Sequence, residues 1–259
     1  MNEEKLEVVE QDDSRTDRYE KEIDIPSNGY LGGPKKVTIR AMTTAEEKIL
    51  YSSRDLSYLT KICKACTVKP KNLDMHTLLP QDFLFMIFQI RELTYGAEYK
   101  QTMRCPYCGY TQDTTINIAD FKYTMLDENI SEKLFVELPM SKAQVHLKLL
   151  SQYEIDSIEE EAMTLFQEGK IADPDSHAMV KKFAKMIESV TGKEFEDEMQ
   201  KYSYVNKLHM RDFNMIRKTI DSVVYGLDNT NEVICQNPNC GKKVEVTGAI
   251  CPEFFRPTE

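Results

Sequence analysis

Two short cysteine pairs, far apart in the sequence, place the strongest constraint on how this chain can fold. The pairs read Cys-Pro-Tyr-Cys-Gly at 105–109 and Cys-Gln-Asn-Pro-Asn-Cys-Gly at 235–241. Each lies at the tip of an expected strand–turn–strand unit. The glycine after the second cysteine suits a knuckle, because the closing position of such a tight turn often needs a positive φ. The distant halves of the chain must therefore meet if the two knuckles form one site.

Four thiolates from two knuckles are enough for a closed tetrahedral zinc site, and the ligands would be Cys105, Cys108, Cys235 and Cys240. The alternatives are iron in a rubredoxin-like site, a redox dithiol, or thiols without a metal. A thioredoxin-type dithiol belongs at a strand-to-helix junction, whereas strands are expected to follow both pairs here. Four thiolates leave no open coordination position, so the interpretation is a structural zinc ion, not a catalytic one.

The other cysteines give weaker signals. The chain has seven cysteines, an odd number, and no apparent export signal, so we expect reduced thiols and not disulfides. Cys63 and Cys66 lie among the apolar positions of a helical pattern with no glycine turn after them, and we interpret them as buried small side chains. Cys251 is expected to pack in the core or at its edge, with a role as spare ligand as the alternative.

No catalytic motif is found in the sequence. It contains no phosphate-binding loop, no G-x-G-x-x-G, no G-x-S-x-G and no H-E-x-x-H. The four histidines, His76, His146, His177 and His209, are scattered over unlike contexts. We therefore expect a protein that is not an enzyme.

Charge is unevenly distributed along the chain. The net charge of the 259 residues is −10, and residues 1–24 contribute −6 of it through ten acidic and four basic side chains. The segment up to about Asp17 shows no apolar periodicity, so it is expected to be a solvated arm, either a solubilising tail or a partner-binding peptide. No apolar run approaches the length of a membrane helix, and we expect a soluble chain made in a cytoplasm.

Local patterns predict both strands and helices. A hairpin is expected at 22–25 and 37–40, followed by helices at 43–51, 55–66 and 81–93, the last apolar on nearly every face. Strands are expected at 98–103, 114–118, 133–138, 145–149 and in the stretch 232–250. Between them, helices are expected from 152 onward, at 174–190, at 194–201 and at 205–225, where Gly226 ends the last one.

The expected fold class is α+β, with an N-terminal hairpin and helices, a split zinc-ribbon-like β region, and a helical insertion between its two knuckles. Four units are expected. They are a disordered acidic arm (1–20), the N-terminal hairpin plus helices (21–96), a β region carrying the knuckles (97–150 and 227–259), and the helical insertion (151–226).

The order of motifs resembles the baseplate hub protein family of T-even-type, contractile-tailed bacteriophages. The segments that carry the resemblance are VTIRAMTTAEEKIL (37–50), LTKICKACTV (59–68) and LLPQDFLFMIFQIRELTYGAEYKQTMRCPYCG (78–109). The similarity implies a non-enzymatic hub component or hub assembly factor. It also implies other baseplate or hub proteins as partners, with the tape measure protein as a further candidate. The location would be the virion tail baseplate, or the host cytoplasm during tail assembly.

A zinc-ribbon nucleic-acid-binding or transcription factor is the alternative, because paired knuckles are common in such proteins. Lys242, Lys243, Lys100 and Arg104 flank the knuckles, but acidic residues on the same hairpins balance them. A duplex-binding protein needs a clustered basic surface. Nucleic acid is therefore not the expected partner, and neither is a membrane.

Overall fold

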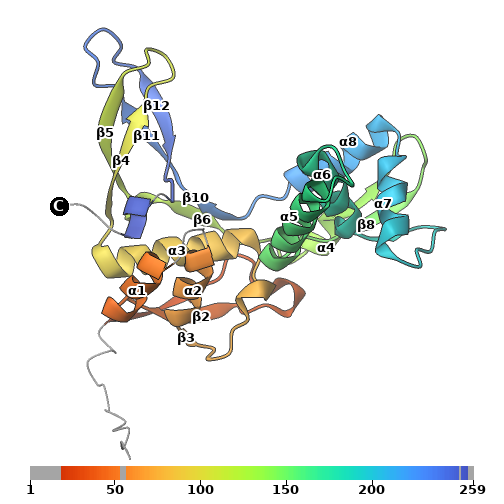
Figure 1. The fold of residues 1–259 in the computed structure, drawn as a ribbon, viewed down its shortest axis with the longest axis horizontal. Helices are drawn as coiled ribbons and strands as arrows, with labels where there is room; N and C mark the ends of the chain where they lie inside the picture. The colour runs from red at the N-terminus through yellow and green to blue at the C-terminus, as the bar shows by residue number, and fades with distance from the viewer. Residues whose placement is uncertain (1–18, 53–56, 251, 256–259) are drawn as a thin grey trace, which may run out of the picture.

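The computed structural model describes residues 19–52, 57–250 and 252–255. Figure 1 shows three parts: a lower body, an upright pair of hairpins above it, and a lobe to the side. The body comprises residues 19–97, the cysteine hairpins residues 98–117 and 230–247, and the lobe residues 125–225. Helices combine with several small antiparallel sheets, so the fold class is α+β as predicted.

The body combines a three-stranded sheet with three helices. Strand β1 (Glu20–Asp24) pairs antiparallel with β2 (Lys36–Arg40), which confirms the predicted N-terminal hairpin. The third strand, β3 (Thr67–Lys69), pairs with β2 and was not predicted. The helices are α1 (Thr44–Ser52), α2 (Ser57–Ala65) and α3 (Pro80–Tyr95), and short 3-10 turns lie at Tyr30–Gly32 and Met75–Thr77.

Helix α3 is the centre of the main core, as its apolar sequence predicts. Pro80 occupies its first turn, where the missing N–H costs nothing. Its apolar side chains from Phe85 to Ile90 pack with both strands of the hairpin and with Phe254 and Phe255 near the C-terminal end. Near the C-terminal end of α3, the buried Arg91 donates hydrogen bonds to the carbonyls of Gly96 and Glu98. The core helix is thereby connected to the first cysteine hairpin.

A partly buried ion pair joins the sheet to the start of α1. Arg40 Nη2 lies 2.9 Å from Glu46 Oε1, and the same guanidinium donates to the carbonyls of Ala41 and Ala65. Thr43 donates to Glu46 through both its N–H and its hydroxyl, and the Thr43 hydroxyl oxygen accepts from the N–H of Ala45 at the start of the helix. Burial opposes the ionisation of Glu46, but the hydrogen bonds from Arg40 and Thr43 outweigh it and lower the pKa of Glu46 to about 2.

This pKa predicts how the stability of the body depends on pH. A carboxylate with a depressed folded-state pKa stabilises the fold above its unfolded pKa, and the contribution is lost as pH falls through the folded value. The loss from Glu46 should therefore develop between about pH 4.5 and about pH 2. Urea unfolding at pH 7 and pH 3 should show a smaller pH effect in Glu46→Gln than in the unmodified chain. Equal pH effects in the two proteins would contradict the assignment.

Two antiparallel hairpins rise from the body and carry the cysteine pairs at their far end (Figure 1). The first consists of β4 (Glu98–Arg104) and β5 (Thr111–Asn117), and the second of β11 (Thr230–Ile234) and β12 (Lys243–Thr247). Both were predicted, with boundaries a few residues different. A 3-10 turn at Ile118–Asp120 follows the first hairpin, and another at Pro252–Phe255 follows the second.

The chain enters and leaves the lobe through one short pair of strands, β6 (Lys122–Thr124) and β10 (Gly226–Asp228). The lobe contains a sheet of β7 (Phe135–Glu137), β8 (Gln144–Leu147) and β9 (Ile187–Val190). Its helices are α4 (Ile130–Lys133), α5 (Gln152–Gln167), α6 (Pro174–Met186), α7 (Glu198–Asn206) and α8 (Met210–Asp221). The predicted starts of α5 and α6 are confirmed by a capping box at Ser151 and by Asp173 as N-cap.

Three expectations for this region were wrong in detail. The helix predicted to reach Val190 ends at Met186, because the following Ile-Glu-Ser-Val segment pairs with β8 as β9. The helices predicted at 194–201 and 205–225 exist with different bounds, as α7 (Glu198–Asn206) and α8 (Met210–Asp221). The break between them precedes Met210, where the His209 side chain caps α8. The strands predicted at 133–138 and 145–149 exist, but they share a sheet with β9 and none with the cysteine hairpins.

These pairings place β7 and β8 in one hydrophobic cluster with residues of α6, α7 and α8. The division of the chain into four domains itself stays a prediction. Among the residues that the structure describes, no helix combines the length and the apolar character needed to cross a membrane.

Candidate metal centre

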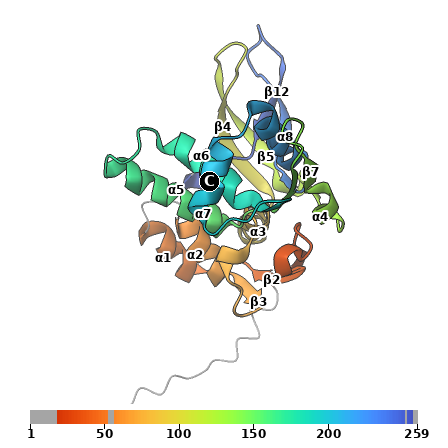
Figure 2. The same cartoon turned by 90° about the vertical axis from the view of Figure 1, so that its right-hand side faces the viewer.

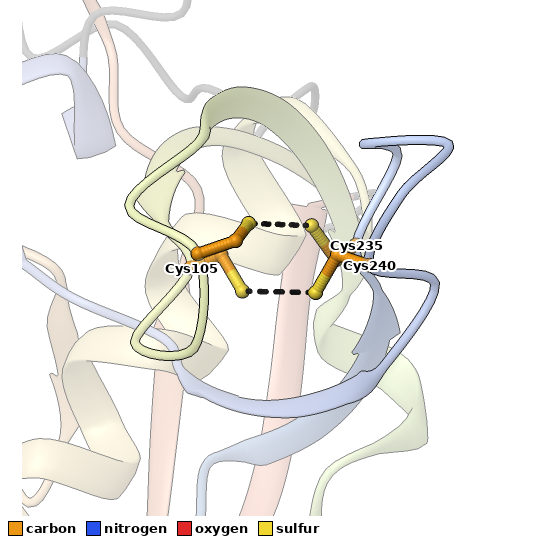
Figure 3. A group of neighbouring side chains, drawn as sticks. Cys105, Cys235 and Cys240 are labelled. Carbon is orange, nitrogen blue, oxygen red and sulfur yellow. Dashed lines mark hydrogen bonds between the residues drawn. The ribbon is translucent and has the colours of Figure 1, made fainter.

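The structure brings the four predicted ligands together at the tip of the two hairpins. The thiol sulfurs of Cys105, Cys108, Cys235 and Cys240 all lie within 4.8 Å of one another. The Sγ atoms of Cys105 and Cys240 are 3.9 Å apart, and those of Cys108 and Cys235 are 3.7 Å apart. Figure 3 shows both contacts crossing from one hairpin to the other.

These distances match the size of a four-thiolate metal site. Four sulfurs placed about 2.3 Å from a central ion at the corners of a tetrahedron are about 3.8 Å apart. The two measured sulfur–sulfur distances lie within 0.1 Å of that value. A disulfide would require sulfurs about 2.0 Å apart. The donor set and these two distances therefore fit a tetrahedral ion, and the remaining sulfur–sulfur distances are at most 4.8 Å.

The glycines after each pair adopt the backbone conformation that the sequence predicted. Gly109 has a φ of 72° and Gly241 a φ of 56°, in the left-handed region where a side chain is strained. The N–H of Gly109 donates to the carbonyl of Cys105, and the N–H of Gly241 donates to the carbonyl of Asn237. Each knuckle is thus closed by a turn that only its glycine accommodates readily.

The four thiols differ in burial and in acidity. Cys105 and Cys235 are buried, Cys240 is half-buried and Cys108 is exposed. Burial opposes ionisation of Cys105, but N–H donors from Tyr107 and Cys108 outweigh it and lower its pKa to about 7. Burial and the neighbouring thiols raise the pKa of Cys235 to about 12. The knuckle backbone therefore favours a thiolate at Cys105, and a cation would be needed to favour one at Cys235.

A buried glutamine connects the two knuckles and was missed in the sequence. Gln112 Nε2 donates to the Ile234 carbonyl at 3.1 Å, and Gln112 Oε1 accepts from the Gln236 N–H at 2.7 Å. The alternation of β5 places this side chain on the inward face with Thr114 and Ile116. A glutamine in register with inward-facing residues beside a cysteine knuckle is the signal that could have identified it.

Similar contacts hold the hairpins together nearer the body. Gln101 donates to the carbonyl of Thr247 and accepts from the N–H of Ala249, and the hydroxyl of Tyr99 donates to the Ala249 carbonyl. A small cluster of buried residues between the hairpins includes Cys105 and Cys235 themselves. Val233 of the second hairpin also packs against the main core, to which Tyr99 and Ile116 of the first hairpin belong. Near their tip, the hairpins therefore rely on a small apolar cluster, a few polar contacts and the cysteines.

Replacing Gln112 by alanine should weaken the connection between the knuckles. The substitution removes two hydrogen bonds between β5 and the second knuckle, each of which typically contributes about 0.5–1.5 kcal/mol. Chemical denaturation with equilibrium metal titration should show lower stability and weaker metal binding than in the unmodified chain. Gln101→Ala, a matched change further from the cysteines, should lower stability but leave metal affinity nearly unchanged. Equal metal affinity in both variants would contradict a role for Gln112 in positioning the knuckles.

The other cysteines that the structure describes do not join the centre. Cys63 and Cys66 are completely buried in the main core, which agrees with their interpretation as packing residues. Burial raises the pKa of Cys66 to about 12. Cys251 lies outside the described residues.

The histidines occupy unrelated positions, as expected. His76 and His146 contact the rings of Tyr153 and Phe135, His177 lies 3.2 Å from the Tyr202 hydroxyl, and His209 caps α8. Within the described part of the chain, the search for metal-ligating groups finds the four-cysteine cluster and no other.

The sequence matches the profile of the family described as T4 bacteriophage base plate protein over residues 17–256. The chain belongs to this family. The match spans the body, the lobe and both cysteine hairpins of the baseplate protein. The resemblance noted in the sequence was carried by residues 37–109, whereas the family match covers the whole described fold. No curated protein and no solved structure matches the chain. Membership implies a location in the virion tail and points to other phage tail proteins as partners.

Proposed function

We propose that this baseplate protein is a non-enzymatic component of the baseplate hub, or a hub assembly factor. We further propose that one structural zinc ion, held by Cys105, Cys108, Cys235 and Cys240, stabilises it. The family match over residues 17–256 supports a role in the baseplate, and the resemblance of residues 37–109 to hub proteins supports the hub as its place there. The closed cluster of four thiols supports the second part of the proposal, the zinc ion.

Zinc in this site would connect two hairpins that lie far apart in the sequence. The ion would supply four metal–sulfur bonds between β4–β5 and β11–β12, whose own apolar contact is small. With four thiolate ligands the coordination shell is complete, so the ion would have no position for a substrate or a reactive water. The proposed role is therefore mechanical, and no reaction is assigned to the centre.

Zinc and iron can be distinguished directly. Elemental analysis of protein purified without chelators should find about one zinc per chain and almost no iron. Replacement by Co²⁺ should give the visible absorption of a tetrahedral thiolate site, and this absorption should be absent in Cys240→Ser. A metal content near zero in reduced protein would contradict the zinc proposal. Iron in place of zinc would require a rubredoxin-like assignment.

The hub role is tested by following the protein in infected cells. Mass spectrometry should detect it among baseplate proteins in purified particles if it is a hub component. It should appear only in assembly intermediates from the lysate if it is an assembly factor. In both cases a tagged chain should recover hub or tape measure proteins. Recovery of tail-fibre or outer baseplate proteins alone would contradict the hub proposal while leaving family membership intact.

The nucleic-acid alternative is tested on the same protein. Electrostatic binding to nucleic acid weakens by roughly one power of the salt concentration for each phosphate contact. Lys243 at the second knuckle lies 2.7 Å from Glu232, which neutralises one of the four cations near the cysteines. We therefore expect little affinity for DNA or RNA even at low salt. Tight, salt-sensitive binding without recovery of a tail protein would favour the nucleic-acid factor.

A further inference from the structure

The end of the cysteine hairpins differs in charge from the rest of the chain. We call residues 104–112 and 234–243 the ribbon tip. It contains Arg104, Lys242 and Lys243 and no aspartate or glutamate, whereas the whole chain has a net charge of −10. Lys243 pairs with Glu232 just outside the tip, so the positive charge of the tip rests on Arg104 and Lys242. Figure 1 shows the tip projecting away from both the body and the lobe. A cationic projection on an acidic protein is a site to which an acidic segment is attracted.

The ribbon tip also exposes large apolar side chains. Tyr107, Tyr110 and Ile234 are 60%, 44% and 62% exposed. The ammonium group of Lys242 lies 4.5 Å from the centre of the Tyr107 ring, so charge and aromatic surface occur together. Tyrosine next to cationic side chains is typical of protein-binding surfaces, where aromatic residues and arginine carry much of the affinity.

The tip is held in shape before any partner arrives. The four cysteines meet across it, and the buried Gln112 bonds to the backbone of both Ile234 and Gln236. A surface that is already ordered loses less conformational entropy on binding than a flexible loop. The tip therefore has the charge, the apolar surface and the order that a docking site for an acidic peptide requires.

A segment with the complementary pattern is present in the same chain. Residues 1–13 contain six acidic side chains and one lysine, and the apolar Leu6, Val8 and Val9 lie between the acids. The described structure begins at Tyr19, next to β1 in the body sheet. Figures 1 and 2 both show this sheet below α3 and the cysteine hairpins above it. The arm therefore starts on the opposite side of the body from the tip of its own chain.

We propose that the ribbon tip binds the acidic N-terminal arm, residues 1–18, of a second copy of this chain. The acidic side chains contact Arg104 and Lys242, and the apolar residues of the arm contact the exposed tyrosines and Ile234. Reciprocal exchange of two arms closes a symmetric dimer. The interaction rests on the proposed zinc site, because the two knuckles must be held together to form the tip.

Sedimentation velocity on the full chain tests the proposal. The chain should self-associate at 50 mM salt and become monomeric at 500 mM, because screening weakens contacts between exposed charges. Deleting residues 1–18 should abolish association, and Arg104→Glu with Lys242→Glu should weaken it by about tenfold or more. The control pair Lys100→Glu with Lys122→Glu changes net charge equally but lies outside the tip, so it should retain association.

A mixing experiment separates exchange between copies from binding within one chain. The deletion variant keeps the tip and the charge-reversed variant keeps the arm, so an equimolar mixture should form a heterodimer. A labelled peptide of residues 1–18 should also bind the deletion variant, and a scrambled peptide should bind it more weakly. The metal content of every variant is measured alongside, so that loss of the cysteine site and loss of arm binding give different results.

Several outcomes would overturn the proposal. They are a monomeric full chain at 50 mM salt, association that survives deletion of the arm, and a mixture that does not form the heterodimer. Binding of a labelled oligonucleotide at the tip without binding of the peptide would identify nucleic acid as the occupant instead.

Discussion

Cys240→Ser is expected to unfold the two cysteine hairpins while the body remains folded. Structural zinc contributes on the order of 10–16 kcal/mol in small zinc modules, whereas whole domains are stable by only about 5–15 kcal/mol. The hairpins have few other sources of stability, because their apolar cluster is small and two of its five buried members are cysteines. The body has its own core around α3, to which the first hairpin contributes Tyr99 and Ile116 near its base, so most of this core should stay folded when the cysteine cluster is lost.

Limited proteolysis with elemental analysis should resolve this effect. The unmodified chain should resist cleavage in residues 98–117 and 230–247, and Cys240→Ser should be cut in both segments and lose its metal. Adding a strong chelator to the unmodified chain should reproduce the same cleavage pattern.

Cys63→Ser provides the matched control, because it makes the same chemical change at a fully buried cysteine outside the cluster. It should cost about 1–3 kcal/mol for burying a hydroxyl and leave the metal content unchanged. Similar cleavage in both variants would contradict a structural metal at the tip.

The two cysteine knuckles could be predicted from the sequence because their signals are local. A glycine after each cysteine pair indicates the turn, and the alternation in β4 and β5 indicates the strands that carry it. Nothing in either half of the sequence shows that the two knuckles face each other. That follows from the lobe, which leaves the chain at the base of the first hairpin because its exit strand β10 pairs with its entry strand β6.

The errors in the lobe have a different origin. Residues Ile187–Val190 continue the apolar pattern of the preceding helix, so periodicity alone extends that helix. The structure ends it at Met186 because β8 offers an edge at which these residues pair. Pairing with β8, a strand distant in the sequence, determines the conformation of residues 187–190, and a short window of sequence does not contain that strand. The same reason explains why β3 and the contacts of Gln112 were missed.

Gly226 has a different role in the structure from the one that its place in the sequence suggests. The sequence places it at the end of a helix, where glycine is common. In the structure α8 ends at Asp221, and Gly226 begins β10 with a φ of 90°. A Cβ atom added there would lie 2.5 Å from the Cβ of Gln81 in α3. Glycine at this position therefore allows the strand that closes the lobe to approach the central helix.

Gly226→Ala is accordingly expected to be strongly destabilising. The left-handed conformation costs about 1–2 kcal/mol with a side chain, and forcing extra volume into a packed contact adds about 1–3 kcal/mol. Urea unfolding should therefore show a loss of about 2–5 kcal/mol in the free energy of unfolding. The pairing of β10 with β6 should loosen as well, which hydrogen exchange at residues 122–124 and 226–228 would report.

Gly192→Ala separates the two causes. Gly192 has a φ of 74°, but an added Cβ would meet no atom within 4 Å. Gly192→Ala should therefore lower the free energy of unfolding only by the conformational cost, about 1–2 kcal/mol, and leave hydrogen exchange in β6 and β10 unchanged. The difference between the two variants measures the close approach of β10 to α3. If both variants lose the same stability, the Gln81 side chain moves aside at no cost in free energy. The contact between Gly226 and Gln81 then does not hold the lobe to the body.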